Sequence, residues 1–175
     1  MKKISLFIAM SLDGYIADSK GGVDWLAGQG NDNNIDSYSE FVKDIDTVIM
    51  GWNTYYQIAA ELSPKEWVYN GFTTYVVTHN PKISSDKIHF TNKNPVELLN
   101  KLREENGKGI WICGGANLIQ QLVREDIIDC YYITIVPTIL GSGIRLFGNA
   151  DHEIKLRLLK TQSYNGMTDL IYIKR

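Results

Sequence analysis

The chain has 175 residues, a formal net charge of −2, 44% hydrophobic residues and 22% charged residues. This length suits a single domain over residues 1–175, and the composition is ordinary for a globular protein in water. Because the net charge is small and no long block of like charge occurs, we expect neither nucleic acid nor a membrane as a partner.

The N-terminal segment and the cysteines bear on the cellular compartment. Two lysines and an apolar run open the chain, but the run stops at Asp13-Gly14 without a cleavage site, so we expect no secretory signal. No apolar stretch approaches the roughly 20 residues that span a bilayer. Cys113 and Cys130 both lie in apolar segments, which predicts two buried thiols in a protein of the reducing cytoplasm.

Patterns typical of strands and helices alternate along the first half of the chain. Residues 3–10 form an apolar run that predicts a central strand, and residues 18–34 are rich in glycine, asparagine and aspartate, which predicts a long loop. The segments that follow predict, in order, a helix at 35–42, a strand at 46–51, a helix at 53–61, and strands at 73–78 and 88–91.

The second half continues the alternation and then changes. The pattern predicts a helix from 95 to about 106, a strand at 109–113, a helix at 116–124 and a strand at 128–136. Two final strands, at 154–163 and 167–174, are joined through Asn165-Gly166, a strong hairpin signal. The whole predicts an α/β fold of three layers, in which helices flank a mixed, mostly parallel sheet that ends in an antiparallel hairpin.

Two junctions between a strand and a helix carry glycine. Gly114-Gly115-Ala116-Asn117 opens a helix, and the bare N–H groups of such a start suit a phosphate or pyrophosphate, although a tight turn without a ligand explains the pattern equally well. The second junction is Gly51-Trp52-Asn53-Thr54. There Asn53 or Thr54 could reach a phosphate or simply cap the helix.

A third strand ends at Thr78-His79, where His79 and Lys82 could hold a further phosphate or carry no ligand. In an open parallel sheet the carboxyl ends of the strands meet at one edge, and ligands bind there. The three junctions together therefore predict a ligand site at this edge of the sheet, one that suits a phosphate-bearing molecule. The G-x-G-x-x-G pattern of a standard Rossmann domain is missing after the first strand, which disfavours that fold.

Five segments, in family order, resemble the dihydrofolate-reductase-like superfamily, and most of all the C-terminal reductase domain of bacterial riboflavin biosynthesis. They are ISLFIAMSLDGYIA, DTVIMGWNTY, TTYVVTHNP, IWICGGANLIQQLV and YYITIVPTILGSGIRLF. The resemblance implies a sheet of about eight strands and NADPH as the hydride donor. It also implies reduction of a small pyrimidine- or pterin-like heterocycle, as in 5-amino-6-(5-phosphoribosylamino)uracil reductase.

The resemblance also implies positions for the cofactor and the substrate. The nicotinamide is expected between the first strand and the loop after it, the pyrophosphate and adenosine along the three junctions, and the substrate beside the segment that begins at Pro137. The cofactor residues implied are Ala9, Met10, Ile16, Ala17, Gly51, Trp52, Asn53, Thr54, Thr78, His79, Gly114, Gly115, Ala116, Asn117 and Leu118.

Two positions depart from the folate enzymes. Those enzymes place an arginine after the glycine of the second junction, and Trp52 cannot replace its forked contact with a 2′-phosphate, so His79 and Lys82 are the expected substitutes. They also place a carboxylate in the first helix. Here Asp36 falls close to that position and Glu40 lies one turn later, so we predict that one of them, or a bound water, supplies the catalytic proton.

The expected reaction is hydride transfer to a C=N or C=O carbon, with closure of loop 18–34 excluding water. Trp25 and Tyr38 could stack on the substrate or merely pack the core. The alternatives are a dinucleotide-binding module without catalysis and a metal-dependent hydrolase, for which the three histidines lack ligand spacing. We expect a homodimer, with the apolar segment 133–140 as a candidate contact.

Overall fold

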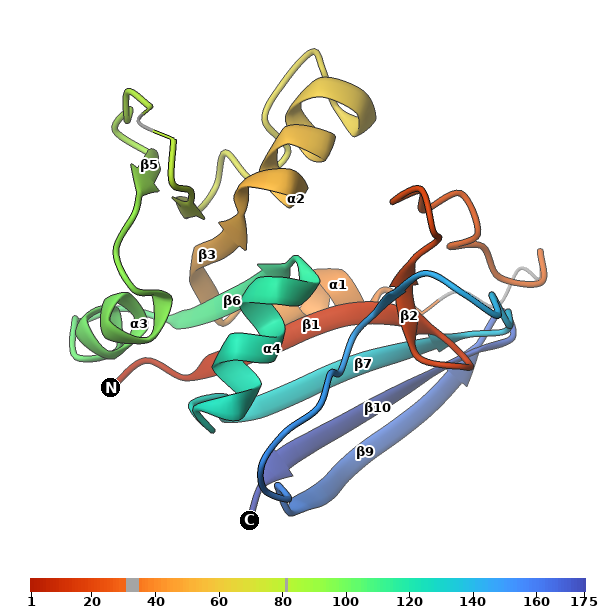
Figure 1. The fold of residues 1–175 in the computed structure, drawn as a ribbon. Helices are drawn as coiled ribbons and strands as arrows, with labels where there is room; N and C mark the ends of the chain where they lie inside the picture. Colours follow the sequence, from red (N-terminus) through yellow and green to blue (C-terminus); the bar gives the residue numbers. More distant parts are fainter. Residues whose placement is uncertain (31–34, 81) are drawn as a thin grey trace.

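The computed structural model describes residues 1–30, 35–80 and 82–175. Within them, eight strands form one sheet in the order β5-β4-β3-β6-β1-β7-β10-β9, and β2 and β8 form a separate pair (Figure 1). β10 runs antiparallel to both of its neighbours, and the other pairs of the large sheet are parallel. The predicted α/β fold with a mostly parallel sheet and a C-terminal antiparallel hairpin is confirmed.

The strands are Ile4–Ser11 (β1), Tyr15–Ala17 (β2), Ile45–Gly51 (β3), Thr73–Val77 (β4), Ile88–Thr91 (β5), Gly109–Gly114 (β6), Cys130–Val136 (β7), Ile144–Arg145 (β8), Leu156–Tyr164 (β9) and Met167–Lys174 (β10). The helices are Ser37–Val42 (α1), Trp52–Gln57 (α2), Pro95–Arg103 (α3) and Ala116–Arg124 (α4), and a π-helical turn, Ile58–Leu62, continues α2. None of the described helices has the length and apolarity needed to cross a membrane.

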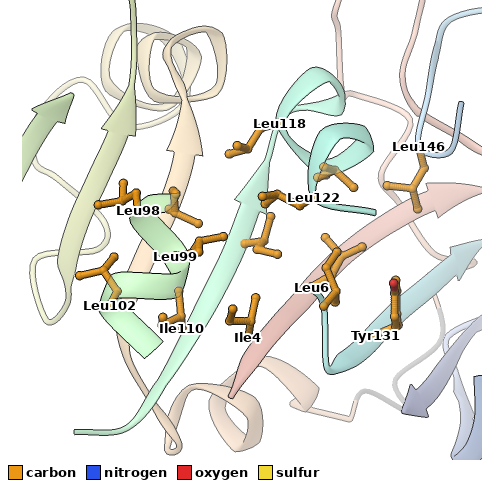
Figure 2. Packing of buried hydrophobic residues seen from close by; sticks show 14 of the residues in the cluster. Ile4, Leu6, Leu98, Leu99, Leu102, Ile110, Leu118, Leu122, Tyr131 and Leu146 are labelled. Carbon is orange, nitrogen blue, oxygen red and sulfur yellow. The ribbon is translucent and has the colours of Figure 1, made fainter. Parts of the chain in front are cut away.

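One face of the sheet is covered by α3 and α4. Figure 2 shows the leucines of these helices directed at Ile4 and Leu6 of β1 and at Ile110 of β6. α3 forms here because Asn94 caps it, accepting hydrogen bonds from the backbone N–H groups of Val96 at 2.9 Å and Glu97 at 3.3 Å, and because a proline fits its first turn.

The other face is covered by α1 and an aromatic cluster. Phe41 of α1 stacks on Phe7 of β1 with 4.5 Å between ring centroids, and both rings pack on Trp111 of β6. β1 is therefore covered on its two faces at once, which explains why its sequence is mostly apolar rather than alternating.

The observed elements differ from the predicted ones at a few boundaries. The helix expected at 35–42 begins at Ser37, the one expected to reach about residue 106 ends at Arg103, and the strand expected at 128–136 begins at Cys130. β2 and β8 were not predicted, since strands of three and two residues carry no periodic signal. Part of the predicted loop, residues 31–34, lies outside the described residues.

Candidate active site

The carboxyl ends of the parallel strands lie along one edge of the sheet, and two of the predicted junctions are direct neighbours there. β3 pairs with β6 so that Met50 lies opposite Gly114, and with β4 so that Gly51 lies opposite Val77. A Cβ atom added to Gly51 would lie 3.8 Å from the backbone nitrogen of Gly115. The structure thus brings the first and second junctions together.

The Gly114-Gly115 pair packs tightly against α2. The peptide bond between the two is cis, and a Cβ on Gly114 or Gly115 would lie 3.3 or 3.0 Å from Thr54 Oγ1. Gly115 is the N-cap residue of α4 and has no side chain to cap it. The backbone N–H groups of the first turn of this nine-residue helix, at Ala116 and Asn117, can therefore serve an anion.

The third junction lies on the next strand, β4. Thr78 is buried and its hydroxyl accepts a hydrogen bond from the N–H of Asn80 at 3.1 Å, while His79 is exposed. Lys82 Nζ lies 4.8 Å from the centre of the Trp52 ring, a cation–π contact that brings a positive charge from the third junction to the second. Pro81, within the same segment, lies outside the described residues.

The expected nicotinamide residues lie where β1 leaves the sheet. Ala9 and Met10 are half-buried on β1, whereas Ala17 is buried on β2 and pairs with Ile144 of β8. Met10 and Ile16 also pack against the core beside α4, as the buried side chain of Leu118 does. Because that side chain packs in the core, the backbone of Leu118 is the part placed to approach a cofactor.

Asp13 ties this region to the segment after β7. Its carboxylate accepts hydrogen bonds from Ser11 Oγ at 2.6 Å and from the backbone N–H groups of Gly141 at 2.7 Å and Leu140 at 3.1 Å. The bond from Ser11, helped by the two N–H groups, lowers the pKa of Asp13 to about 2 despite the opposing effect of desolvation. The sequence indicated only a turn at this aspartate, and the role of its carboxylate in holding the segment after β7 was missed.

The described part of the long loop, residues 18–30, bridges two sides of the site. Gln57 Nε2 of α2 donates to the Gly21 carbonyl at 2.9 Å, and the N–H of Gln29 donates to the carbonyl of Asn165, in the β9–β10 turn, at 2.9 Å. Trp25 Nε1 donates to the Gly22 carbonyl within the loop itself. Closure of this loop over a ligand stays a prediction.

The carboxylates predicted as proton donors lie on α1. Asp36 is the N-cap residue, is exposed, and accepts the N–H of Ser39 at 2.9 Å; its hydrogen bonds with Ser39 lower its pKa. A lowered pKa leaves a smaller fraction of this carboxyl group protonated at neutral pH, so it is less available as a proton donor. Glu40 is exposed, and the Tyr38 ring, also partly exposed, packs edge-on against Phe7. These catalytic and stacking roles stay predictions, as does the substrate role of the exposed Pro137.

A cavity of about 580 Å³ lies on the α1 side of the sheet. Phe7, Phe41 and Tyr132 give it aromatic walls, and the buried carboxylate of Asp169 on β10 lies at one end. Sequence reasoning missed Asp169. The available signal was an aspartate in the middle of the apolar strand MTDLIYIK, where this residue type is rare.

The described cysteines and histidines form neither a reactive thiolate nor a metal cluster. Both thiols are free, and burial raises the pKa of Cys113 to about 12 and that of Cys130 above its usual range, so neither is a reactive thiolate. Among residues 1–30, 35–80 and 82–175, no group of three His, Cys, Asp or Glu side chains could hold a metal ion.

The fold and its glycine-lined edge define the dihydrofolate-reductase-like class. A dihydrofolate reductase from Enterococcus faecalis, complexed with NADP(H) and RAB-propyl, matches with a TM-score of 0.69 at 18% identity, over 99% of this chain and 96% of that one. Residues 2–170 match the model of the RibD C-terminal domain, and the chain belongs to that family. The predicted family resemblance is confirmed.

Two relatives span the full length of the chain. The uncharacterized protein YwjB of Bacillus subtilis (strain 168) is 39% identical, over 99% of this chain and 98% of its own. A crystal structure from Shewanella sp. PV-4, of a protein assigned provisionally to riboflavin biosynthesis, has a TM-score of 0.86 at 29% identity and covers 99% of each chain. Membership of a reductase family is therefore established, and the substrate is not fixed by these similarities.

Proposed function

We propose that this protein is an NADPH-dependent reductase that transfers a hydride to a small pyrimidine- or pterin-like heterocycle, as 5-amino-6-(5-phosphoribosylamino)uracil reductase does. The observation that carries the proposal is the meeting of Gly51 and the Gly114-Gly115 pair at one edge of the sheet, with β1 as the strand next to β6. Membership of the RibD C-terminal domain family and the similarity to the Shewanella protein support it.

The residues at this edge fit NADPH. The uncapped first turn of α4 suits the pyrophosphate, and its backbone can be approached closely because Gly115 has no side chain. Thr78 and His79 would face the adenosine ribose, and Ala9 and Ile16 would flank the nicotinamide. When bound, NADPH supplies the hydride, which is the difficult part of the chemistry.

In this reaction the protein itself orients the substrate and excludes water. The bridge from α2 through Gly21 to the β9–β10 turn spans the edge where the ligands would lie, so the loop is placed to shield them. The product also needs a proton. The lowered pKa of Asp36 favours Glu40 or a bound water as its source.

A titration with NADPH and, separately, NADH tests the proposal, with quenching of tryptophan fluorescence as the signal. We expect micromolar binding of NADPH and an affinity about tenfold lower for Gly115→Ala, a change of about 1.4 kcal/mol. Gly71→Ala is the matched control, because a Cβ there meets nothing within 4 Å. Failure of the native protein to bind either cofactor would overturn the proposal.

Turnover separates this proposal from its alternative. A dinucleotide-binding module without catalysis would bind NADPH but oxidise it with no pterin, pyrimidine or small carbonyl compound. That alternative has one structural argument in its favour, since both predicted proton donors on α1 are exposed to solvent. NADPH oxidation that depends on one of these substrates would reject it.

We also propose a homodimer in which the segment that follows β7 forms the contact. Ile139 is 71% exposed there, and the nearby Ile144 and Phe147 are 43% and 40% exposed. Exposed apolar patches often mark protein interfaces, and these three side chains lie close together in the sequence. Sedimentation equilibrium should give a dimer for the native chain and a monomer for Ile139→Lys; a monomeric native chain would refute the proposal.

A further inference from the structure

Asp169 is a buried carboxylate whose contacts are all with neutral groups. Asp169 is 5% exposed, and each of its two carboxylate oxygens accepts two hydrogen bonds. The donors are Thr134 Oγ1 at 2.7 Å and Tyr164 Oη at 3.1 Å for Oδ1, and Ser37 Oγ at 2.5 Å and Gln162 Nε2 at 2.9 Å for Oδ2. None of the ion pairs found in the described residues involves Asp169, although four lysines line the same cavity: Lys2, Lys3, Lys108 and Lys160.

A buried charge without a cationic partner is costly, even when neutral donors surround it. The same fold could have placed an apolar residue at this position of β10, since Met167 and Ile171, two positions away on the same face of the strand, are apolar. A retained negative charge on the wall of a cavity therefore indicates a ligand that offers the missing positive charge.

The sheet register places this charge beside the predicted hydride site. Asp169 on β10 lies opposite Thr134 on β7, and Thr134 lies opposite Ala9 on β1. Because neighbouring strands are about 4.8 Å apart, Asp169 lies about 10 Å from Ala9 across the sheet. Thr134 lies between the two, and Thr134 and Asp169 both line the 580 Å³ cavity.

The direction of the hydrogen bonds decides which ligands this end of the cavity accepts. Thr134 and Ser37 direct their hydroxyl protons at the carboxylate, so each presents its remaining lone pairs as an acceptor. Ser37 Oγ already accepts from Gln162 Nε2 at 2.9 Å, so Thr134 keeps more of its acceptor capacity on the cavity wall. An N–H donor is favoured here, and an anionic group is repelled.

We propose that Asp169 and Thr134 form a recognition subsite for the N–H-bearing, positively polarised edge of a planar nitrogen heterocycle, whose ring lies against Phe7, Phe41 and Tyr132. The proposal rests on the proposed function and deepens it by naming the residues that select the N–H-bearing edge of that substrate. Asp169 is a positioning residue in this account, because it acts through the hydroxyl that it orients and through its charge.

Three isosteric probes test the subsite without knowledge of the substrate: benzamidine, which is cationic and rich in N–H donors, neutral benzamide, and anionic benzoate. Ligand-observed NMR titrations of the full chain should rank their affinities in that order. Asp169→Asn should weaken benzamidine about tenfold or more and benzamide by less than about threefold. Asp44→Asn, an exposed carboxylate at the other end of the same cavity, is the matched control and should change neither.

Thr134→Val provides a second variant in case Asp169→Asn unfolds, because it removes the oriented hydroxyl and keeps the volume and three of the four bonds to the carboxylate. It should also narrow the difference between benzamidine and benzamide. A purely structural network would instead lower the melting temperature and leave the order of the probes unchanged, which would overturn the proposal. The proposal would also be overturned if benzamidine binding were lost in Asp44→Asn but kept in Asp169→Asn.

NADPH binding, measured in the same samples, separates this proposal from the one on which it rests. If the native chain ranks the probes as expected but binds no dinucleotide, the proposed function fails and the subsite stands. If NADPH binds with equal affinity to the native chain and to Asp169→Asn while benzoate binds as well as benzamidine, the proposed function stands and the subsite fails.

Discussion

Alanine at Gly114 and alanine at Gly115 should destabilise the protein for different reasons. Gly114 has φ = +143°, a conformation that alanine adopts only under strain, and such strain costs about 1–3 kcal/mol. Gly115 has φ = −91°, which alanine adopts readily, but its Cβ would lie 3.0 Å from Thr54 Oγ1. Thr54 must then move by a few tenths of an ångström, and we expect a cost of about 1 kcal/mol.

A double-mutant cycle with Thr54→Ala separates the two causes. Thermal unfolding is a suitable assay, since about 1 kcal/mol shifts Tm by about 2–4 °C in a chain of this size. Removing the Thr54 hydroxyl should recover most of the stability lost in Gly115→Ala and little of that lost in Gly114→Ala. Gly71→Ala again serves as the control.

The reasoning would be refuted by equal rescue of the two alanine variants. Equal rescue would mean that the destabilisation in Gly114→Ala comes from contact with Thr54 and not from the strained backbone conformation at that position. Absence of rescue in either variant would mean that Thr54 does not pack against the glycine pair as the structure places it.

Three further predictions follow from named contacts. Leu122→Ala, in the core at 0% exposure, should cost about 2–5 kcal/mol in denaturant unfolding, and a cost below 1 kcal/mol would contradict the packing beside α4. Lys82→Ala should weaken NADPH about tenfold and leave NADH unchanged, because only NADPH carries the 2′-phosphate; equal weakening of both would contradict this. Since the pKa of Asp13 is lowered from 3.8 to about 2, its stabilising effect is complete above pH 3.8 and is lost as the pH falls toward 2. Unfolding curves of native protein and Asp13→Asn should therefore converge over that interval, and parallel curves would contradict the assignment.

Much of the fold could be predicted because its elements carry local signals. α4 has the predicted bounds, Ala116–Arg124, since a glycine pair precedes a helical spacing of Leu118, Ile119 and Leu122. β5 likewise matches its predicted range, and Asn165-Gly166 forms the expected turn between β9 and β10, with Asn165 at φ = +47° and Gly166 at φ = +75°. These features depend on residues close together in the sequence, which a pattern can detect.

The missed parts of the site depend on distant residues. The Asp13 carboxylate meets Leu140, 127 positions away, and Asp169 meets Ser37, 132 positions away. No local pattern indicates that the aspartate after β1 holds the segment after β7. Nor does one indicate that the serine at the start of α1 donates a hydrogen bond to a carboxylate on β10. The prediction of Asp36 as the functional carboxylate followed a family position in the chain, whereas the side chain at that position caps its own helix.

The strand order now gives these separate observations a common geometry. β4, β3 and β6 carry the glycine and polar junctions that suit the cofactor, β1 stands next to them, and β7 and β10 carry Thr134 and Asp169 on the far side. In our proposal the cofactor and the substrate therefore lie side by side across the sheet, and the hydride passes from one to the other above β1. Most strands that contact the cofactor therefore lie on one side of β1 in the sheet, and β7 and β10, which contact the substrate, lie on the other. It follows that substitutions on β10 can change the substrate without disturbing the dinucleotide site, so a relative that keeps the Gly114-Gly115 pair but replaces Asp169 should bind the same cofactor and reduce a different compound.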